Sequence, residues 1–287
     1  MAMNKPSRSD PGAVFVARGD GEIIGDSPDR RVEILSDHDA LHATWSRFAP
    51  GREGADLHVH HRHTDLFYVL EGTFTLRLGI EDGNVEAGPG TLVCIPPLVV
   101  HGFRNGSDAE TRFLNFHAPG RAFADYMRAI RDGRSFSYDQ HDPPADGGRS
   151  PSDAQIGGHE FAFDYAGTRV SLLTDVEEIA VCETQADAGV PSPTRHLHQR
   201  HVESFFVIDG AMTFETGGRR LQAEAGSWVQ IPPGVPHTFS ALDDGPAHFL
   251  NLHTPSSHFS MFLRGLFEAR SDEERAAIRA GFDEVPA

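Results

Sequence analysis

The sequence predicts an all-β protein built from two tandem copies of one small module, and two observations lead to this prediction. Segments recur along the 287-residue chain at a nearly constant spacing. Most of each copy consists of short apolar runs closed by glycine or proline, as in the evenly spaced strands of a sandwich or barrel. Helical spacing of apolar residues appears only near the end of each copy.

The internal repeat is long and regular. Residues 31–37 (RVEILSD) recur as 169–175 (RVSLLTD), and residues 113–119 (FLNFHAP) recur as 249–255 (FLNLHTP) after a small deletion in the second copy. Matches of this length in one order predict a duplication. A stretch rich in Pro, Gly and Asp between the copies predicts a linker. We therefore expect an N-terminal domain over 12–138, a linker over 139–158 and a C-terminal domain over 159–287.

Strands and helices are expected at matched places in the two copies. In the first copy the alternating or continuous apolar runs predict strands at 66–70, 73–78, 91–95 and 112–117. Apolar residues at helical spacing then predict one helix through 123–130 and its counterpart through 259–266. A last helix is expected over 272–280, because Ser271 and Glu274 form the pattern of a capping box.

Charge and composition exclude some partners. The formal net charge of −17 disfavours binding to nucleic acid and to anionic membranes, since both need a basic surface. The first eleven residues lack the apolar core of a signal peptide, and no run approaches the ~18 apolar residues of a membrane helix. We expect a cytoplasmic protein. Cys94 and Cys182 lie in apolar runs and are expected to be buried free thiols.

Each copy carries three histidines and one carboxylate that could hold a metal. Histidines two apart on a strand, as in His58-x-His60, point to the same face. Neutral imidazole and carboxylate groups suit Fe, Mn, Co, Ni, Cu or Zn, so one divalent transition metal is expected in each barrel. The alternative is that these histidines lie on exposed loops and bind nothing. The spacing of three histidines and one carboxylate is long and occurs in both copies, which favours a metal site. The two sets are His58, His60, Asp65 and His101, and His196, His198, Glu203 and His237.

These residues resemble the two motifs of the cupin superfamily, G(X)5HXH(X)3,4E(X)6G and G(X)5PXG(X)2H(X)3N. The resemblance covers nearly the whole chain. It implies a bicupin with two tandem antiparallel jelly-roll barrels, each followed by short α-helices, and it implies that the eight residues named above are the metal ligands. Asp65 stands where the motif has Glu and is one methylene shorter, so its direct contact with the metal is left open.

The surroundings of each metal are expected to be aromatic and mostly apolar. Strand alternation places Phe67 on the face of Asp65 and Phe205 on the face of Glu203. Phe103 and Phe239 follow the third histidine of each set by two residues, and together these four phenylalanines predict a pocket. No cluster of Arg or Lys lies on these inward faces.

Five further histidines recur near the sites. His61, His63 and His201 fall between the paired histidines and the carboxylate, and we expect them on the surface. His117 and His253 sit at matched places on the last strand of each copy. For these two, a structural hydrogen bond and a supporting role behind the ligands both stay open.

The chain is similar to the quercetin 2,3-dioxygenase-like bicupins. This similarity implies a metal-dependent dioxygenase that uses O2 on an aromatic or enolic, flavonol- or diketone-like molecule, with Glu203 and Asp65 as bases. A metal-dependent isomerase or lyase with a carboxylate proton shuttle is the alternative, and a non-enzymatic binding protein is a third. We expect the two copies to pack as an intramolecular pseudo-dimer, and pairing of whole chains into a homodimer is left open.

Overall fold

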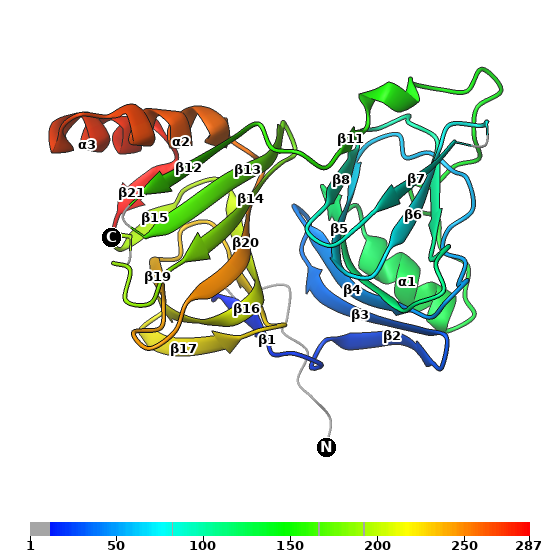
Figure 1. Ribbon diagram of the computed structural model, residues 1–287, viewed down its shortest axis with the longest axis horizontal. Coiled ribbons are helices and arrows are strands. Elements are labelled where there is room, and N and C mark those ends of the chain that lie inside the picture. Colours follow the sequence, from blue (N-terminus) through cyan, green and yellow to red (C-terminus); the bar gives the residue numbers. More distant parts are fainter. Residues whose placement is uncertain (1–11, 82, 166, 192) are drawn as a thin grey trace. The chain divides into compact units, whose positions relative to one another are not determined.

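The computed structural model describes residues 12–287 apart from 82, 166 and 192, and it confirms the all-β class (Figure 1). The chain forms two compact units. One comprises Gly21–Gly158, and the other comprises His159–Ala287 together with the described residues up to Asp20. We call these the first and the second barrel. Each consists of antiparallel strands with helices after the last strand of the duplicated segment.

The first barrel is built from two antiparallel sheets. The larger follows the order β11-β8-β5-β10-β4-β3-β2 and the smaller the order β7-β6-β9. Its elements are β2 (Glu22–Ser27), β3 (Arg30–Asp37), β4 (His42–Phe48), β5 (Thr64–Glu71), β6 (Phe74–Leu78), β7 (Gly83–Ala87), β8 (Leu92–Ile95), β9 (His101–Arg104), β10 (Thr111–Ala118), α1 (Phe123–Arg131), a 3-10 turn at Pro151–Asp153 and β11 (Gln155–Ile156).

The second barrel repeats this order, with β16 running without a break through the positions that β5 and β6 occupy in the first. The strand path is β12-β13-β14-β20-β16-β19-β15-β21, with β17 and β18 also paired to β16. Its elements are β1 (Val14–Val16), β12 (Phe161–Tyr165), β13 (Thr168–Val176), β14 (Ile179–Ala186), β15 (His196–His198), β16 (Val202–Thr216), β17 (Arg219–Glu224), β18 (Trp228–Ile231), β19 (His237–Ala241), β20 (Ala247–Thr254), α2 (Phe259–Glu268), α3 (Asp272–Gly281) and β21 (Glu284–Pro286).

The compact units have limits other than the domain boundaries predicted from the sequence. β1, placed in the N-terminal domain by the prediction, pairs with β18 of the second barrel, while β11, placed in the linker, pairs with β8 of the first. β8 and β18 are equivalent strands. Each would otherwise present unpaired backbone groups at a sheet edge, and a short added strand satisfies those groups. In each barrel a segment from outside the repeat thus pairs with the equivalent edge strand.

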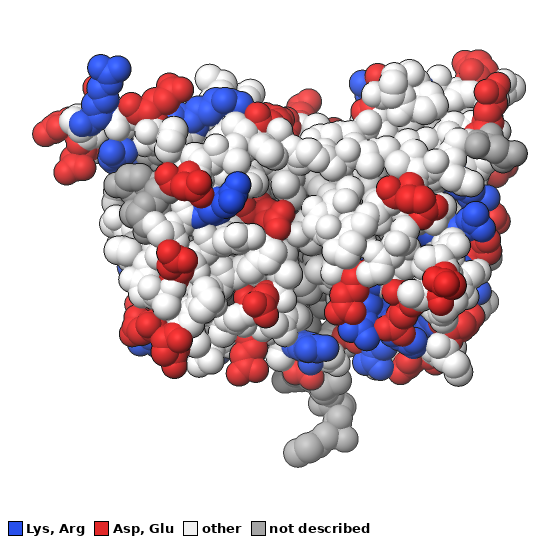
Figure 2. Space-filling model, viewed as in Figure 1, with Lys and Arg blue, Asp and Glu red and all other residues white. Residues whose placement is uncertain are grey.

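Each barrel encloses an apolar core formed by alternate residues of its strands. In the first barrel this core includes the fully buried Phe67, Phe74 and Val93. Gly72 ends β5 at a φ of 74°, and a Cβ there would collide with the carbonyl oxygen of Glu110, so the turn after β5 requires glycine. On the face seen in Figure 2, basic side chains lie scattered among acidic ones.

The helices confirm the sequence prediction and differ in what they pack against. α1 lies on β2 and β3, whereas α2 lies on β13 and also on α3 (Figure 1). α3 begins after Ser271, whose hydroxyl accepts the backbone N–H of Glu274, as the capping pattern predicted. The Glu274 carboxylate bonds the backbone N–H of Arg270 rather than that of Ser271.

Two smaller predictions can also be compared with the structure. Cys94 and Cys182 are buried and are not joined in a disulfide, as expected. Within the described part of the chain, no helix has the length and apolar character needed to cross a bilayer.

Candidate metal centres

The paired histidines of the first barrel lie on a short extended segment held from both sides. His58 forms a bridge with His101 on β9, and Val59 forms one with His141. Residues on either side of Val59 therefore point to the same side, toward the barrel interior. Asp65, near the start of β5, pairs with Ile95 and with His117. Three separate segments thus bring the four predicted residues together.

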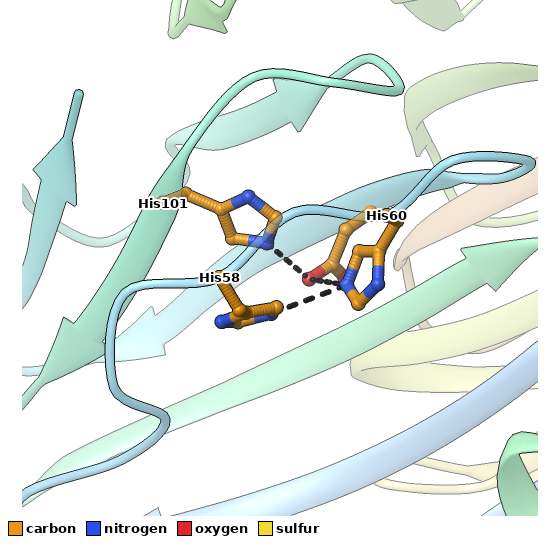
Figure 3. Close-up of side chains that lie close together, drawn as sticks. His58, His60 and His101 are labelled. Atoms are coloured by element: carbon orange, nitrogen blue, oxygen red, sulfur yellow. Dashed lines mark hydrogen bonds and ion pairs between the residues drawn. The ribbon is translucent and has the colours of Figure 1, made fainter. Parts of the chain in front are cut away.

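The imidazoles of the first barrel converge on a common point (Figure 3). His58 Nε2 lies 3.3 Å from His60 Nε2, and Asp65 Oδ2 lies 3.3 Å from His101 Nε2 and 3.6 Å from His60 Nε2. Ligand atoms about 2.1 Å from one ion, at tetrahedral or octahedral angles, lie about 3.0–3.4 Å apart. Two of the three distances lie in this range and the third is slightly longer, so the spacing is close to that around a metal ion. The shorter Asp65 side chain does reach the cluster.

The ring orientations in the first barrel also suit metal binding. In each imidazole Nδ1 lies within hydrogen-bond distance of a backbone carbonyl oxygen: Asp56 for His58, Asp139 for His60, and Val99 for His101. An Nδ1–H that donates to a carbonyl leaves the lone pair on Nε2, the nitrogen that faces the cluster. Each ring is thus held in the tautomer that a ligand needs.

Burial and neighbouring groups fix the charges of the first cluster. Burial lowers the pKa of His58 to about 3, assisted by the nearby imidazoles, so this ring is neutral at pH 7. Burial opposes the ionisation of Asp65, but the surrounding imidazoles outweigh it and hold the pKa of that carboxyl well below its usual value. A carboxylate among imidazoles is a donor set typical of Fe, Mn, Co, Ni, Cu or Zn.

The second barrel brings His196, His198, Glu203 and His237 together, but the carboxylate sits closer to the rings. Glu203 Oε2 lies 2.6 Å from His237 Nε2 and 3.0 Å from His198 Nε2, which are hydrogen-bond distances. Burial opposes protonation of His237, yet the bond to Glu203 raises its pKa above the usual value. His198 Nδ1 is buried without a hydrogen-bond partner among the described residues. This cluster has the donors for a metal in a more contracted arrangement.

A cavity of about 330 Å³ opens beside the cluster of the first barrel. His58, His60 and Asp65 form part of its lining. Apolar side chains from the strands and from α1 cover much of the remainder, including Phe48, Phe103, Phe113, Phe123, Tyr126 and Met127. The candidate ligands of the first barrel therefore face a partly open, largely apolar space with five Phe or Tyr side chains in its lining.

The predicted pocket phenylalanines do not all line this space. Phe103 does, whereas Phe67 is packed in the barrel core with its ring centroid 4.9 Å from that of Phe74. In the second barrel Phe205 and Phe239 also pack together, 4.7 Å apart, within or against the core. No cluster of Arg or Lys was expected on the inward faces, and one arginine, Arg30, lines the cavity.

The prediction that His63 and His201 lie on the surface is wrong. Both side chains are fully buried. His63 Nδ1 bonds to the buried Asp139, and His201 Nδ1 bonds to the buried Asp283. Each aspartate also accepts a backbone N–H from the turn that carries the histidine. His61 is exposed, as expected. Asp139 and Asp283 were missed; each follows an aromatic residue, Tyr138 or Phe282, but they are 144 residues apart and so fall out of step with the repeat.

A sequence model described as Cupin domain matches residues 44–117 and 184–253. The two matches together cover half of the chain, and the chain therefore belongs to the cupin family. Because both matches fall on the duplicated segments, the protein is a bicupin.

Comparison with known proteins gives one curated relative and many similar folds. Quercetin 2,3-dioxygenase of Bacillus subtilis is 27% identical over 127 residues, which cover 44% of this chain and 36% of that protein. The match thus spans about a third of the relative's length. A mutant of Bacillus subtilis oxalate decarboxylase has a TM-score of 0.60 at 16% identity, over 84% of this chain and 77% of that one. The formate complex of Lactobacillus farciminis oxalate decarboxylase has a TM-score of 0.59 at 12% identity, over 92% and 95%. At these identities the likeness concerns the fold.

Proposed function

We propose that this protein is a metal-dependent dioxygenase acting on an aromatic or enolic small molecule in the cavity of the first barrel. The observation that carries this proposal is that His58, His60 and Asp65 line a largely apolar cavity of about 330 Å³ whose wall includes five Phe or Tyr side chains. This volume is in the range of small-molecule sites. Aromatic walls favour a planar ring system by stacked and edge-to-face contacts. The similarity to quercetin 2,3-dioxygenase supports the same substrate class.

Each residue of the first cluster has a role in this proposal. His58, His60, Asp65 and His101 hold one transition metal, which when bound supplies Lewis acidity and a template for substrate and O2. The Asp65 carboxylate is also the proposed acceptor of the proton from the substrate hydroxyl, and its Oδ1 accepts a hydrogen bond from the Asn115 amide. The apolar walls limit the access of water to the reacting groups.

We assign the second barrel a structural role, with a metal held by His196, His198, Glu203 and His237. Residues equivalent to the cavity lining are packed together there. Phe259 and Phe262 of α2 belong to a buried cluster that includes Leu172 and Cys182, and Ile278 of α3 packs against it. The Phe262 ring stacks on Phe282 with centroids 4.2 Å apart. In this proposal Glu203, the other predicted base, binds the metal of the second barrel and does not contact a substrate.

A lyase acting on a carboxylic acid is the second candidate. Arg30 lines the cavity of the first barrel, and its buried Nε has no hydrogen-bond partner among the described residues. A guanidinium group binds carboxylate strongly and with defined geometry. Several solved structures with a similar fold are oxalate decarboxylases. Arg30 favours a substrate that combines an acidic group with an apolar body.

Oxygen uptake separates the two candidates. Protein loaded with each of the six metals is mixed with flavonols, 1,3-diketones and dicarboxylic acids, while O2 consumption and CO2 release are followed. The dioxygenase proposal predicts O2 uptake in step with substrate loss and label from isotopic O2 in the product. Substrate loss without O2 uptake would assign a lyase, and capture without turnover would leave a binding protein.

The Arg30→Met variant tests the contribution of the cavity guanidinium. It should raise KM for substrates that carry a carboxylate and leave KM for neutral substrates unchanged. Arg134→Met removes a charge from a side chain that is 63% exposed and serves as the matched control. Equal effects of Arg30→Met on both substrate types would argue against a contact with the acid.

A further inference from the structure

A buried chain of hydrogen bonds leads away from the carboxylate of the first cluster. Asn115 Nδ2 lies 2.5 Å from Asp65 Oδ1, and Asn115 Oδ1 lies 3.0 Å from His117 Nε2. His117 Nδ1 lies 3.0 Å from His63 Nε2, and His63 Nδ1 lies 3.0 Å from Asp139 Oδ2. All five side chains are at least nine-tenths buried.

The second barrel repeats this chain link by link. Asn251 Nδ2 lies 2.9 Å from Glu203 Oε1, and Asn251 Oδ1 lies 2.8 Å from His253 Nε2. His253 Nδ1 is 2.9 Å from His201 Nε2, and His201 Nδ1 is 2.9 Å from Asp283 Oδ2. The chain is thus the same in both barrels, although the carboxylate it reaches is an aspartate in one and a glutamate in the other.

The links of the chain determine which way the asparagine amide faces. His117 Nε2–H donates to Asn115 Oδ1, so the Nδ2 of the same amide must point toward Asp65. Without this donor the amide could rotate and present its oxygen to the carboxylate. The His117 ring is itself held by stacking on Phe123, with centroids 3.8 Å apart. A neutral imidazole donates through only one nitrogen, so with His63 Nδ1–H on Asp139 the proton between the two rings comes from the Tyr138 hydroxyl, which lies 3.1 Å from His63 Nε2 and 3.2 Å from His117 Nδ1. Buried polar groups cost stability unless they are paired, so these bonds hold the chain in place.

We propose that Asp139, His63, His117 and Asn115 orient the Asp65 carboxylate for metal binding, and that Asp283, His201, His253 and Asn251 do the same for Glu203. These residues act through the carboxylate, so they are positioning residues. The inference rests on the proposed metal binding but not on the proposed reaction. A carboxylate that loses its orientation should bind the metal more weakly and with a changed coordination geometry.

The test uses three identical substitutions in the full-length protein. His117→Phe and His253→Phe each remove the imidazole links of one barrel but keep an aromatic ring on Phe123 or Phe259. His42→Phe is the control, because His42 is buried beside Phe123 and neither ring nitrogen has a hydrogen-bond partner among the described residues. Co²⁺ dissociation constants are measured by competition with a chelator, and the visible spectrum of bound Co²⁺ reports its coordination.

The proposal predicts that His117→Phe weakens Co²⁺ binding at one site by about 10- to 100-fold and shifts its spectrum, the usual effect of losing a group behind a ligand. His253→Phe should weaken Co²⁺ binding and shift the spectrum at the site of the second barrel. His42→Phe should leave Co²⁺ binding at both sites unchanged. A folded His117→Phe protein with wild-type affinity and spectrum would overturn the proposal. If His117→Phe does not fold, Asn115→Leu is used instead, and wild-type Co²⁺ affinity and spectrum in that variant would likewise overturn the proposal. Wild-type protein that binds no Co²⁺ would instead overturn the metal centre itself, which is a distinct result.

Discussion

Replacing Asp65 by asparagine keeps the shape of the side chain and removes the negative charge of the first cluster. The Asp65 side chain is 3% exposed and lies among three imidazoles, so solvent cannot compensate for the lost charge. Removing one partner of a buried charge pair costs about 3–5 kcal/mol. At about 1.4 kcal/mol per factor of ten, Asp65→Asn should weaken metal binding at this site by about two to three and a half orders of magnitude.

The assay is a competition titration of the purified variant with a chelator of known affinity. Asp108→Asn is the control, since it changes the same charge at an exposed position. The control should bind metal as the wild type does. A loss below tenfold in Asp65→Asn would refute the assignment of Asp65 to the metal, even though its carboxylate lies at the cluster.

Three further predictions concern stability. Phe262→Ala should lower the free energy of unfolding by about 3–5 kcal/mol, because Phe262 is 7% exposed and stacks on Phe282. A loss below about 1 kcal/mol in urea unfolding would contradict the close packing of this cluster. Acidifying the metal-free protein from pH 7 to 5 should destabilise it. Burial lowers the pKa of His58 and His63 to about 3, so the unfolded chain, with ordinary values near 6.5, binds more protons below that pH. Below pH 6.5 each of these two histidines lowers the free energy of unfolding by about 1.4 kcal/mol per pH unit. His237, whose pKa is raised, partly offsets this loss. A free energy of unfolding that does not change between pH 7 and 5 would refute the prediction. Metal at 100 times its Kd should raise the free energy of unfolding by about 2.7 kcal/mol, measurable as a higher Tm, whereas an unchanged Tm would argue against binding to the folded state.

The duplicated fold and both clusters could be predicted because their signals are local and recur. A histidine pair at i and i+2 faces one side of any strand, so the side chains of His58 and His60 meet wherever that strand lies. The repeat then transfers the same geometry to His196 and His198. Family resemblance supplied the third histidine and the carboxylate, which come from distant segments of the chain.

The buried positions of His63 and His201 could not be derived in the same way. His63 and His201 each lie in a turn between the histidine pair and the following strand. This turn would be exposed if the domain ended at β10 or β20, the last strand of each repeat. Asp139 and Asp283 return from beyond the helices and bind that turn, which makes the histidines internal. The sequence signal for this return is weak, because it consists of a single aspartate after an aromatic residue in each copy.

The difference between the barrels was also hidden in the sequence. The helical stripes through 123–130 and 259–266 have nearly the same apolar pattern. Only packing separates them, because α3 adds Ile278 to the apolar cluster of the second barrel while the side chains of α1 line a cavity in the first.

Anomalous X-ray scattering from crystals grown with one of the six metals locates the ion directly. Diffraction at the absorption edge of that metal should give a peak in the first barrel about 2.1 Å from the Nε2 atoms of His58, His60 and His101. Well-ordered crystals that show those side chains with no anomalous density between them would contradict the account.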